Sequence, residues 1–169
     1  TTVLSAYAGV TYKPTHMIEK IEKKYFGDVW EKNYSKKDTN DSKSRPMPIS
    51  LCGMTKILEG YGVRYKYVRD FSDSLAKQEI EAHLRTGNPV IFVVAAKSRK
   101  DGAVANKWTS GYHCMTMLGM TDTGKVIVAD SVDRSTKTFG NNQRIKYASL
   151  GELIGYMFPC TNTTSTSIY

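Results

Sequence analysis

Cysteine is scarce in this sequence. Three occur among 169 residues, namely Cys52, Cys114 and Cys160. A small and odd number of cysteines provides no disulfide framework, so the fold must be stabilised by an ordinary hydrophobic core. So few cysteines are compatible with a cytosolic protein and with a secreted one, and they leave the redox compartment open.

The sequence signatures of several function classes are also absent. No apolar run is long enough to span a membrane, and no signal peptide occurs within residues 1–169, which leaves export open. There is no glycine-rich phosphate loop, no zinc-finger spacing and no RNA-binding signature. We therefore expect no transmembrane segment and no nucleic-acid partner.

Charge is unbalanced in favour of basic residues. Lys and Arg number 24 against 16 Asp and Glu, which gives a formal net charge of +8. A positive charge of this size attracts anionic surfaces. The basic residues are dispersed, however, without the run of five or six like charges that marks a binding tail. The charge fits an anionic cell-wall polymer or an acidic peptide as partner, and equally an ordinary solvated surface.

Length and composition predict the domain organisation. A chain of 169 residues with 40% hydrophobic content is long enough to bury one proper core. We predict a single domain over residues 1–160. Residues 161–169 are mostly Thr, Ser and Asn, a composition that predicts a disordered tail.

The most informative segment is a predicted hairpin with a histidine at one end and an aspartate at the other. His113 opens an apolar run, a turn follows over residues 122–124, and a second apolar run ends at Asp130. Antiparallel pairing brings these two ends to one edge of the sheet. A His beside an Asp is the base-and-orienter half of a nucleophilic triad. The alternative is a structural core histidine and a turn aspartate.

The surrounding pattern predicts an α+β fold. Residues 1–8 predict a helix stopped at Gly9, residues 74–86 a further helix with Leu75, Ile80 and Leu84 toward the core, and residues 150–156 a short helix capped by Ser149. The strands are expected at residues 63–68, 90–95 and 144–147, besides the hairpin, with residues 90–95 covered on both faces.

The order of these segments resembles a known family. A helix over residues 50–60 feeds a strand, a second helix precedes Gly87-Asn88-Pro89-Val90-Ile91, and Gly111-Tyr112-His113 follows. This succession resembles the papain-like cysteine peptidases that remove double-glycine leaders from bacteriocins, and their secreted bacterial relatives, over residues 1–158. The resemblance implies a papain-like cysteine peptidase fold, with N-terminal helices packed on a mostly antiparallel sheet.

Carried over to this chain, the resemblance implies that His113 is the catalytic base and Asp130 its orienter. Ser131 stands where the family usually has proline after the Asp. The family's nucleophilic cysteine caps the first helix, and residues 1–9 look like the later part of that helix. We therefore expect the nucleophile a few residues upstream of Thr1, and the oxyanion-hole glutamine further upstream. Thiolate attack on a peptide or protein substrate requires no metal and no organic cofactor.

Other assignments remain open. Cys52 precedes a helix, where a thiol pKa is lowered, and could be the nucleophile instead. Cys114 would point away from His113 and is expected in the core, whereas Cys160 could be paired or free. Thr1 at a mature N-terminus could itself act as a nucleophile. A catalytically inactive papain-like module that binds a peptide or a cell-wall component is the alternative to an enzyme.

The resemblance also bears on localisation. Its members are bacterial, and many relatives are secreted, so we expect an extracellular or cell-surface protein of a Gram-positive bacterium. A cytoplasmic location stays open, because neither the cysteines nor residues 1–169 decide it.

Overall fold

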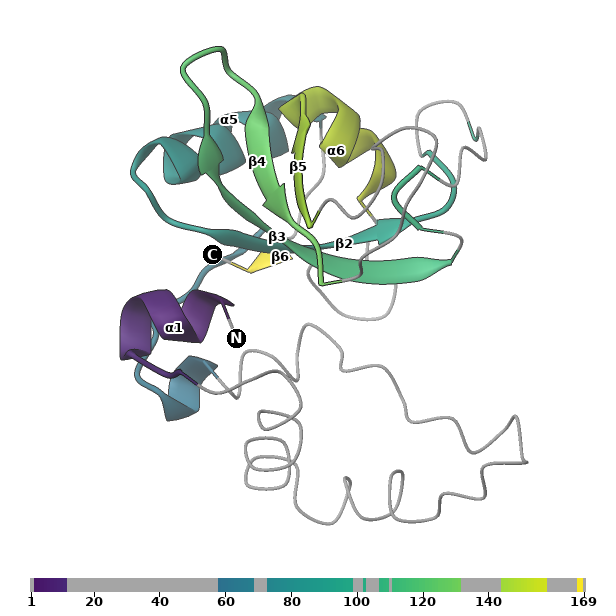
Figure 1. The fold of residues 1–169 in the computed structure, drawn as a ribbon. Helices are drawn as coiled ribbons and strands as arrows, with labels where there is room; N and C mark the ends of the chain where they lie inside the picture. Colours follow the sequence, from purple (N-terminus) through teal and green to yellow (C-terminus); the bar gives the residue numbers. More distant parts are fainter. Residues whose placement is uncertain are drawn as a thin grey trace, which may run out of the picture. The chain divides into compact units, whose positions relative to one another are not determined.

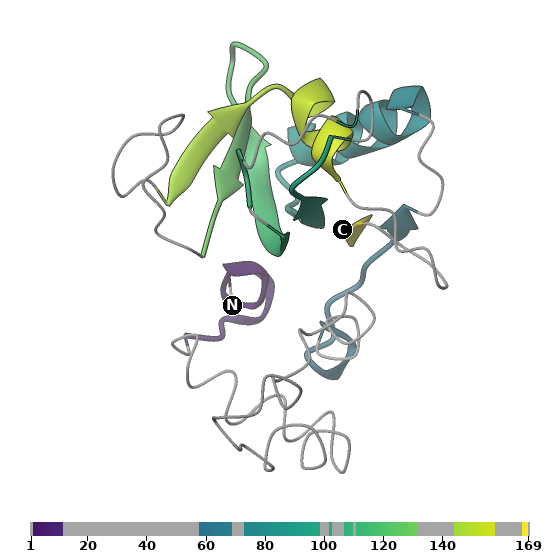
Figure 2. The same cartoon turned by 90° about the vertical axis from the view of Figure 1, so that its right-hand side faces the viewer.

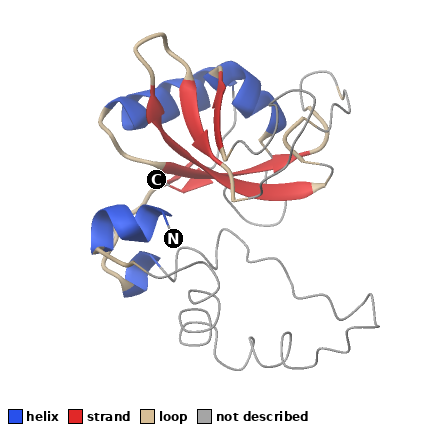
Figure 3. Cartoon of the chain, viewed as in Figure 1, coloured by secondary structure: helices blue, strands red, loops and turns tan. Residues whose placement is uncertain are grey.

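An antiparallel sheet is the main feature of the computed structural model of this protein (Figure 1). Its six strands lie in the order β1-β6-β2-β3-β4-β5, and each pair of neighbours is antiparallel. Helices accompany the sheet, as Figure 3 shows, so the α+β prediction is confirmed. The strands are β1 (Tyr67–Val68), β2 (Val90–Ala95), β3 (Tyr112–Met120), β4 (Val126–Ala129), β5 (Ile145–Ala148) and β6 (Ser167–Ile168).

The structure describes residues 2–11, 58–68, 73–98, 102, 107–109, 111–131, 144–157 and 167–168. The chain divides into two compact units, Thr1–Tyr65 and Lys66–Tyr169. The single domain predicted over residues 1–160 would require these units to associate, and that association stays a prediction. Within the described ranges, no helix is both long enough and apolar enough to cross a membrane.

The first unit contains helix α1 (Thr2–Ala8), which ends where the sequence predicts. Gly9 adopts a φ of +62°, a left-handed conformation that glycine reaches without a Cβ clash. The N–H of Val10 then donates to the carbonyl of Leu4, 3.3 Å away, and both side chains are buried. The residues that follow Thr1 are therefore helical and do not begin a strand.

Two helices of the second unit, α5 (Asp73–Arg85) and α6 (Leu150–Tyr156), lie on one face of the sheet. Figure 2, turned by 90° from Figure 1, shows the two helices together on that face. Helix α6 begins at Ser149, whose hydroxyl accepts a hydrogen bond from the backbone N–H of Glu152. This cap satisfies one of the backbone donors that a helix start leaves unpaired, as the sequence predicts.

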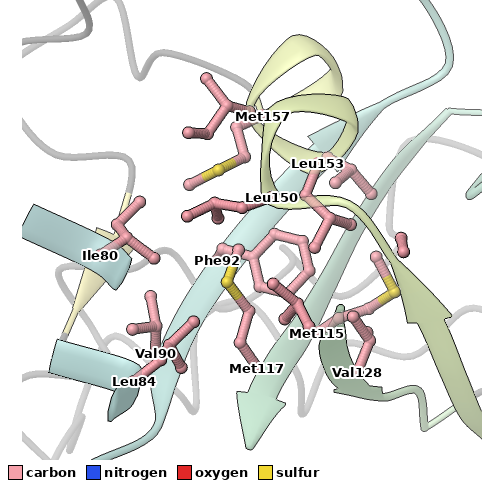
Figure 4. Packing of buried hydrophobic residues seen from close by; sticks show 14 of the residues in the cluster. Ile80, Leu84, Val90, Phe92, Met115, Met117, Val128, Leu150, Leu153 and Met157 are labelled. Carbon is pink, nitrogen blue, oxygen red and sulfur yellow. The ribbon is translucent and has the colours of Figure 1, made fainter. Parts of the chain in front are cut away.

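The core fills the space between these helices and the sheet (Figure 4). Residues 90–94 of β2 are all buried, so this strand is covered on both faces as predicted. The ring of Phe92 lies beside Leu150 and Leu153 from α6. On β3 and β4, burial falls on alternate residues that face the helices, namely Met115, Met117, Val126 and Val128.

Three predictions differ from the structure. Leu75 is predicted in the core, but it is 58% exposed, because it lies roughly 140° around α5 from the buried Ile80. The strand predicted at residues 63–68 is limited to β1. Ser167–Ile168 of the predicted disordered tail form β6, which pairs with β1 and β2 and so satisfies backbone groups at the edge of β2. The other tail residues lie outside the described ranges.

The two leucines of α5 provide a matched test of the core. Leu84→Ala removes a side chain that is 2% exposed and should lower the free energy of unfolding by about 2–5 kcal/mol. Leu75→Ala should change it by less than about 0.5 kcal/mol, because that side chain is in solvent. Urea unfolding followed by circular dichroism measures both values. Equal losses in the two variants would contradict the packing described here.

Candidate active site

His113 and Asp130 are in direct contact where β3 begins and β4 ends, as the hairpin pattern predicts. Nε2 of His113 lies 2.6 Å from Oδ1 of Asp130. His113 is near the start of β3, and Asp130 follows the end of β4, the strand that pairs with β3. The N–H of Asp130 donates to the carbonyl of Arg144 at 2.8 Å, which continues the β4–β5 ladder and fixes the backbone under the carboxylate.

The two side chains differ in their access to solvent. The His113 side chain keeps 17% of its surface exposed, whereas the Asp130 side chain keeps 2%. A group that exchanges protons with a substrate must be reachable, but a group that only holds the imidazole need not be. The exposures therefore fit a reactive imidazole supported from within by a carboxylate.

The hydrogen bond also decides which imidazole nitrogen can act as a base. A carboxylate only accepts hydrogen bonds, so Nε2 of His113 must carry the proton in this contact. In a neutral imidazole the lone pair then resides on Nδ1. Nδ1 is the nitrogen that can take a proton from a neighbouring thiol or water.

Lys146 completes the cluster, and sequence reasoning missed it. Its ammonium contacts Oδ2 of Asp130, the oxygen that His113 does not use, and its side chain is only 2% exposed. Residues 144–147 predict a strand, and β5 is the last strand at that side of the sheet. The strand pattern indicates no role for Lys146. A lysine that alternates with apolar residues usually lies on the solvent-exposed face of a strand, so the sequence does not indicate that this lysine is buried.

The three polar side chains come together because they extend three columns of the core. Residues two positions apart on a strand point to the same face. His113, Asp130 and Lys146 each lie two positions from a buried apolar residue of the helix-covered face. Those neighbours are Met115 on β3, Val128 on β4 and Ala148 on β5. The cluster is thus the polar end of the hydrophobic core.

Cys114 follows His113 directly, so it lies on the opposite face of β3. Its side chain is half-buried, less than the full burial expected from the sequence. Burial raises the pKa of the Cys114 thiol to about 12, so the group is protonated at neutral pH. A protonated thiol is a poor nucleophile. Cys114 therefore has neither the orientation nor the ionisation to attack a carbonyl near His113.

The other predicted nucleophiles, Cys52 and Thr1, lie outside the described residues, as does Cys160. Within the part that the structure describes, His, Cys, Asp and Glu side chains nowhere gather in threes as a metal site would require. The described cluster consists of an imidazole, a carboxylate and an ammonium.

The segment before β3 is attached to α6. Lys107 forms an ion pair with Glu152 and lies over the ring of Trp108, its ammonium 5.8 Å from the ring centroid. Trp108 is 3% exposed and belongs to the core. Thr109 accepts a 3.2 Å hydrogen bond from the N–H of Gly111, two residues before His113. These contacts link residues 107–109 to α6, to the core and to the residue before β3.

Fold and site together define an α+β protein whose sheet edge carries a hydrogen-bonded His–Asp pair. A family model described as the Peptidase_C39 like family matches residues 1–152, and the chain belongs to this family. The match indicates a cysteine peptidase-like function and a peptide or protein substrate. No curated protein matches the chain.

The ionisation of Cys114 predicts its reactivity. With a pKa of about 12, roughly one thiol in ten thousand is ionised at pH 8, against about a quarter for an ordinary cysteine. We expect iodoacetamide to leave Cys114 unmodified in the folded protein at pH 8 and to modify it in guanidinium chloride. Peptide mass spectrometry measures both extents. Rapid modification in the folded state would contradict the burial of this thiol.

The buried ion pair predicts a large effect on stability. Lys146→Met removes the ammonium that contacts the buried Asp130 carboxylate, which should lower the free energy of unfolding by about 3–5 kcal/mol. Lys107→Met is the matched control, because its ion pair is 25% and 29% exposed, and such pairs contribute about 1 kcal/mol or less. Chemical denaturation of both variants tests the difference. A smaller loss for Lys146→Met than for Lys107→Met would rule out the paired arrangement.

Proposed function

We propose that this protein is a cysteine peptidase of papain-like fold, related to the double-glycine leader peptidases and their secreted relatives. His113 is the general base, Asp130 orients it, and the nucleophilic cysteine lies in residues that precede Thr1. The observation that carries the proposal is the 2.6 Å contact between Nε2 of His113 and Oδ1 of Asp130. The match of residues 1–152 to the Peptidase_C39 like family supports the same chemistry.

The reaction follows from the orientation of the imidazole. Nδ1 of His113 takes the proton of the cysteine thiol, and the thiolate attacks the scissile carbonyl carbon. The imidazolium then gives that proton to the leaving amine, and a thioester to the substrate's acyl part remains. Water, deprotonated by the same Nδ1, hydrolyses the thioester and regenerates the thiol. Asp130 holds the ring in one tautomer and stabilises its cationic form in each half of the reaction.

Ser131 departs from the family pattern beside the site. Proline after the aspartate would fix the φ angle at that point, whereas serine has no ring and leaves φ free. Here the backbone of Asp130 is held instead by the hydrogen bond from its N–H to the carbonyl of Arg144. The substitution therefore leaves the orientation of the carboxylate supported.

The proposal also covers the cellular location of the enzyme. We infer an extracellular or cell-surface location in a Gram-positive bacterium, with attraction to an anionic cell-wall polymer. The net charge of +8 supports attraction to anionic surfaces. Co-sedimentation with purified teichoic acid, repeated at high salt, tests the attraction, since screening should release an electrostatically bound protein. Binding that does not respond to salt would argue against this part of the proposal.

Activity of the full-length protein tests the proposed roles. We expect cleavage of a quenched-fluorescence peptide library, and a fall in kcat of about 10²- to 10⁴-fold in His113→Ala and in Asp130→Asn. His83→Gln is the control, because His83 is half-buried on α5 and takes no part in the cluster. This variant should keep wild-type kinetics. A covalent peptidyl vinyl sulfone should label the protein at a cysteine encoded before Thr1.

The same experiment distinguishes an active peptidase from the catalytically inactive binding module. A full-length protein without an upstream cysteine, or with one whose loss leaves cleavage intact, would overturn the proposed nucleophile. Absence of cleavage together with retained peptide or cell-wall binding would favour the inactive module. Labelling of Cys52 with loss of activity would instead transfer the role of nucleophile to that residue.

A further inference from the structure

We infer that Lys146 is a positioning residue of the peptidase site, which holds the Asp130 carboxylate in the orientation that His113 requires. The inference rests on the proposed function, because it assigns a third residue to the His113–Asp130 pair. The ammonium of Lys146 contacts Oδ2 of Asp130, so the proposed role is exerted through the carboxylate.

The two oxygens of the Asp130 carboxylate contact different side chains. Oδ1 of Asp130 meets Nε2 of His113, and Oδ2 meets the ammonium of Lys146. A carboxylate with one partner can rotate about the bond to its Cβ, whereas opposed contacts on its two oxygens fix that rotation. The partners come from β3 and β5, the two strands that flank β4, so the carboxylate is held from both sides.

The charges favour the same arrangement. The Asp130 and Lys146 side chains are each 2% exposed, so neither charge is solvated by bulk water. A nearby cation favours the ionised form of a carboxylate, and a buried carboxylate without one tends to take up a proton. Only the ionised form can stabilise an imidazolium and keep the proton on Nε2. The Lys146 ammonium therefore provides an opposite charge beside the buried carboxylate that contacts His113.

A partly exposed ion pair of the same unit provides a structural comparison. Lys107 and Glu152 join the segment before β3 to α6, and their side chains remain 25% and 29% exposed. The pair of Lys146 and Asp130 is buried and ends on an imidazole that retains solvent access. Because the Lys146–Asp130 pair is buried and contacts the imidazole, we assign a functional role to this pair and not to Lys107 and Glu152.

The test uses Lys146→Met in the full-length protein, with Lys107→Met as the matched control. We expect Lys146→Met to lower kcat by about 10- to 100-fold, the usual effect of losing a residue that orients a reactive one, with KM unchanged. The proton that His113 shares with Asp130 should give a strongly downfield ¹H signal, which is assigned by its loss in Asp130→Asn. This signal should weaken or disappear in Lys146→Met and persist in Lys107→Met.

Each outcome decides the inference. A structural role alone would lower the unfolding midpoint and leave the downfield signal, kcat and KM of the folded protein unchanged, which would overturn the inference. Should Lys146→Met not fold, Lys146→Gln is decisive by the same readouts, since it removes the charge and keeps an N–H donor near Asp130. If the protein cleaves no peptide, the proposed function fails separately, because the ¹H signal still reports whether Lys146 positions the His113–Asp130 pair.

Discussion

The burial of one carboxylate, that of Asp130, is the constraint on which the arrangement of the sheet edge depends. A charge removed from water is tolerated only when hydrogen-bond donors and an opposite charge surround it. Here the donors come from His113 and Lys146 on the two flanking strands. The register of β4 with both neighbours is therefore tied to the site, because a slip of one residue would turn these side chains to the other face.

The site and the hydrophobic core share one face of the sheet. The columns of the core along β3, β4 and β5 end in the three polar residues, and α6 packs over the apolar part. Packing density fixes the strands to within small displacements, since interiors are filled as closely as organic crystals. A rigid core thus provides the precision that hydrogen bonds among His113, Asp130 and Lys146 require. Stability and chemistry are coupled through a common set of strands.

Much of the fold could be predicted from local pattern. The continuous apolar run of β2, the hairpin of β3 and β4, and the Ser149 cap of α6 depend on residues close together in sequence, so periodicity and capping rules reach them. The prediction for Leu75 departed from that periodicity. Leu75 lies roughly 140° around the helix from Ile80 and roughly 180° from Leu84, so the three residues do not share one face of α5, and Leu75 is 58% exposed.

The sequence by itself determined the hairpin and, through it, the meeting of His113 with Asp130, because a short turn and antiparallel pairing leave the ends of two strands adjacent. Only the tertiary structure decided the place of Lys146. By hydrophobicity alone, Ile145 and Tyr147 would face the core, yet they are 42% and 54% exposed while Lys146 is buried. Pairing of Val126 with Ala148 sets that register, and the buried carboxylate gives the inward lysine a partner. The burial of Lys146 depends on a charge that only folding brings next to it, so no local sequence pattern predicts it.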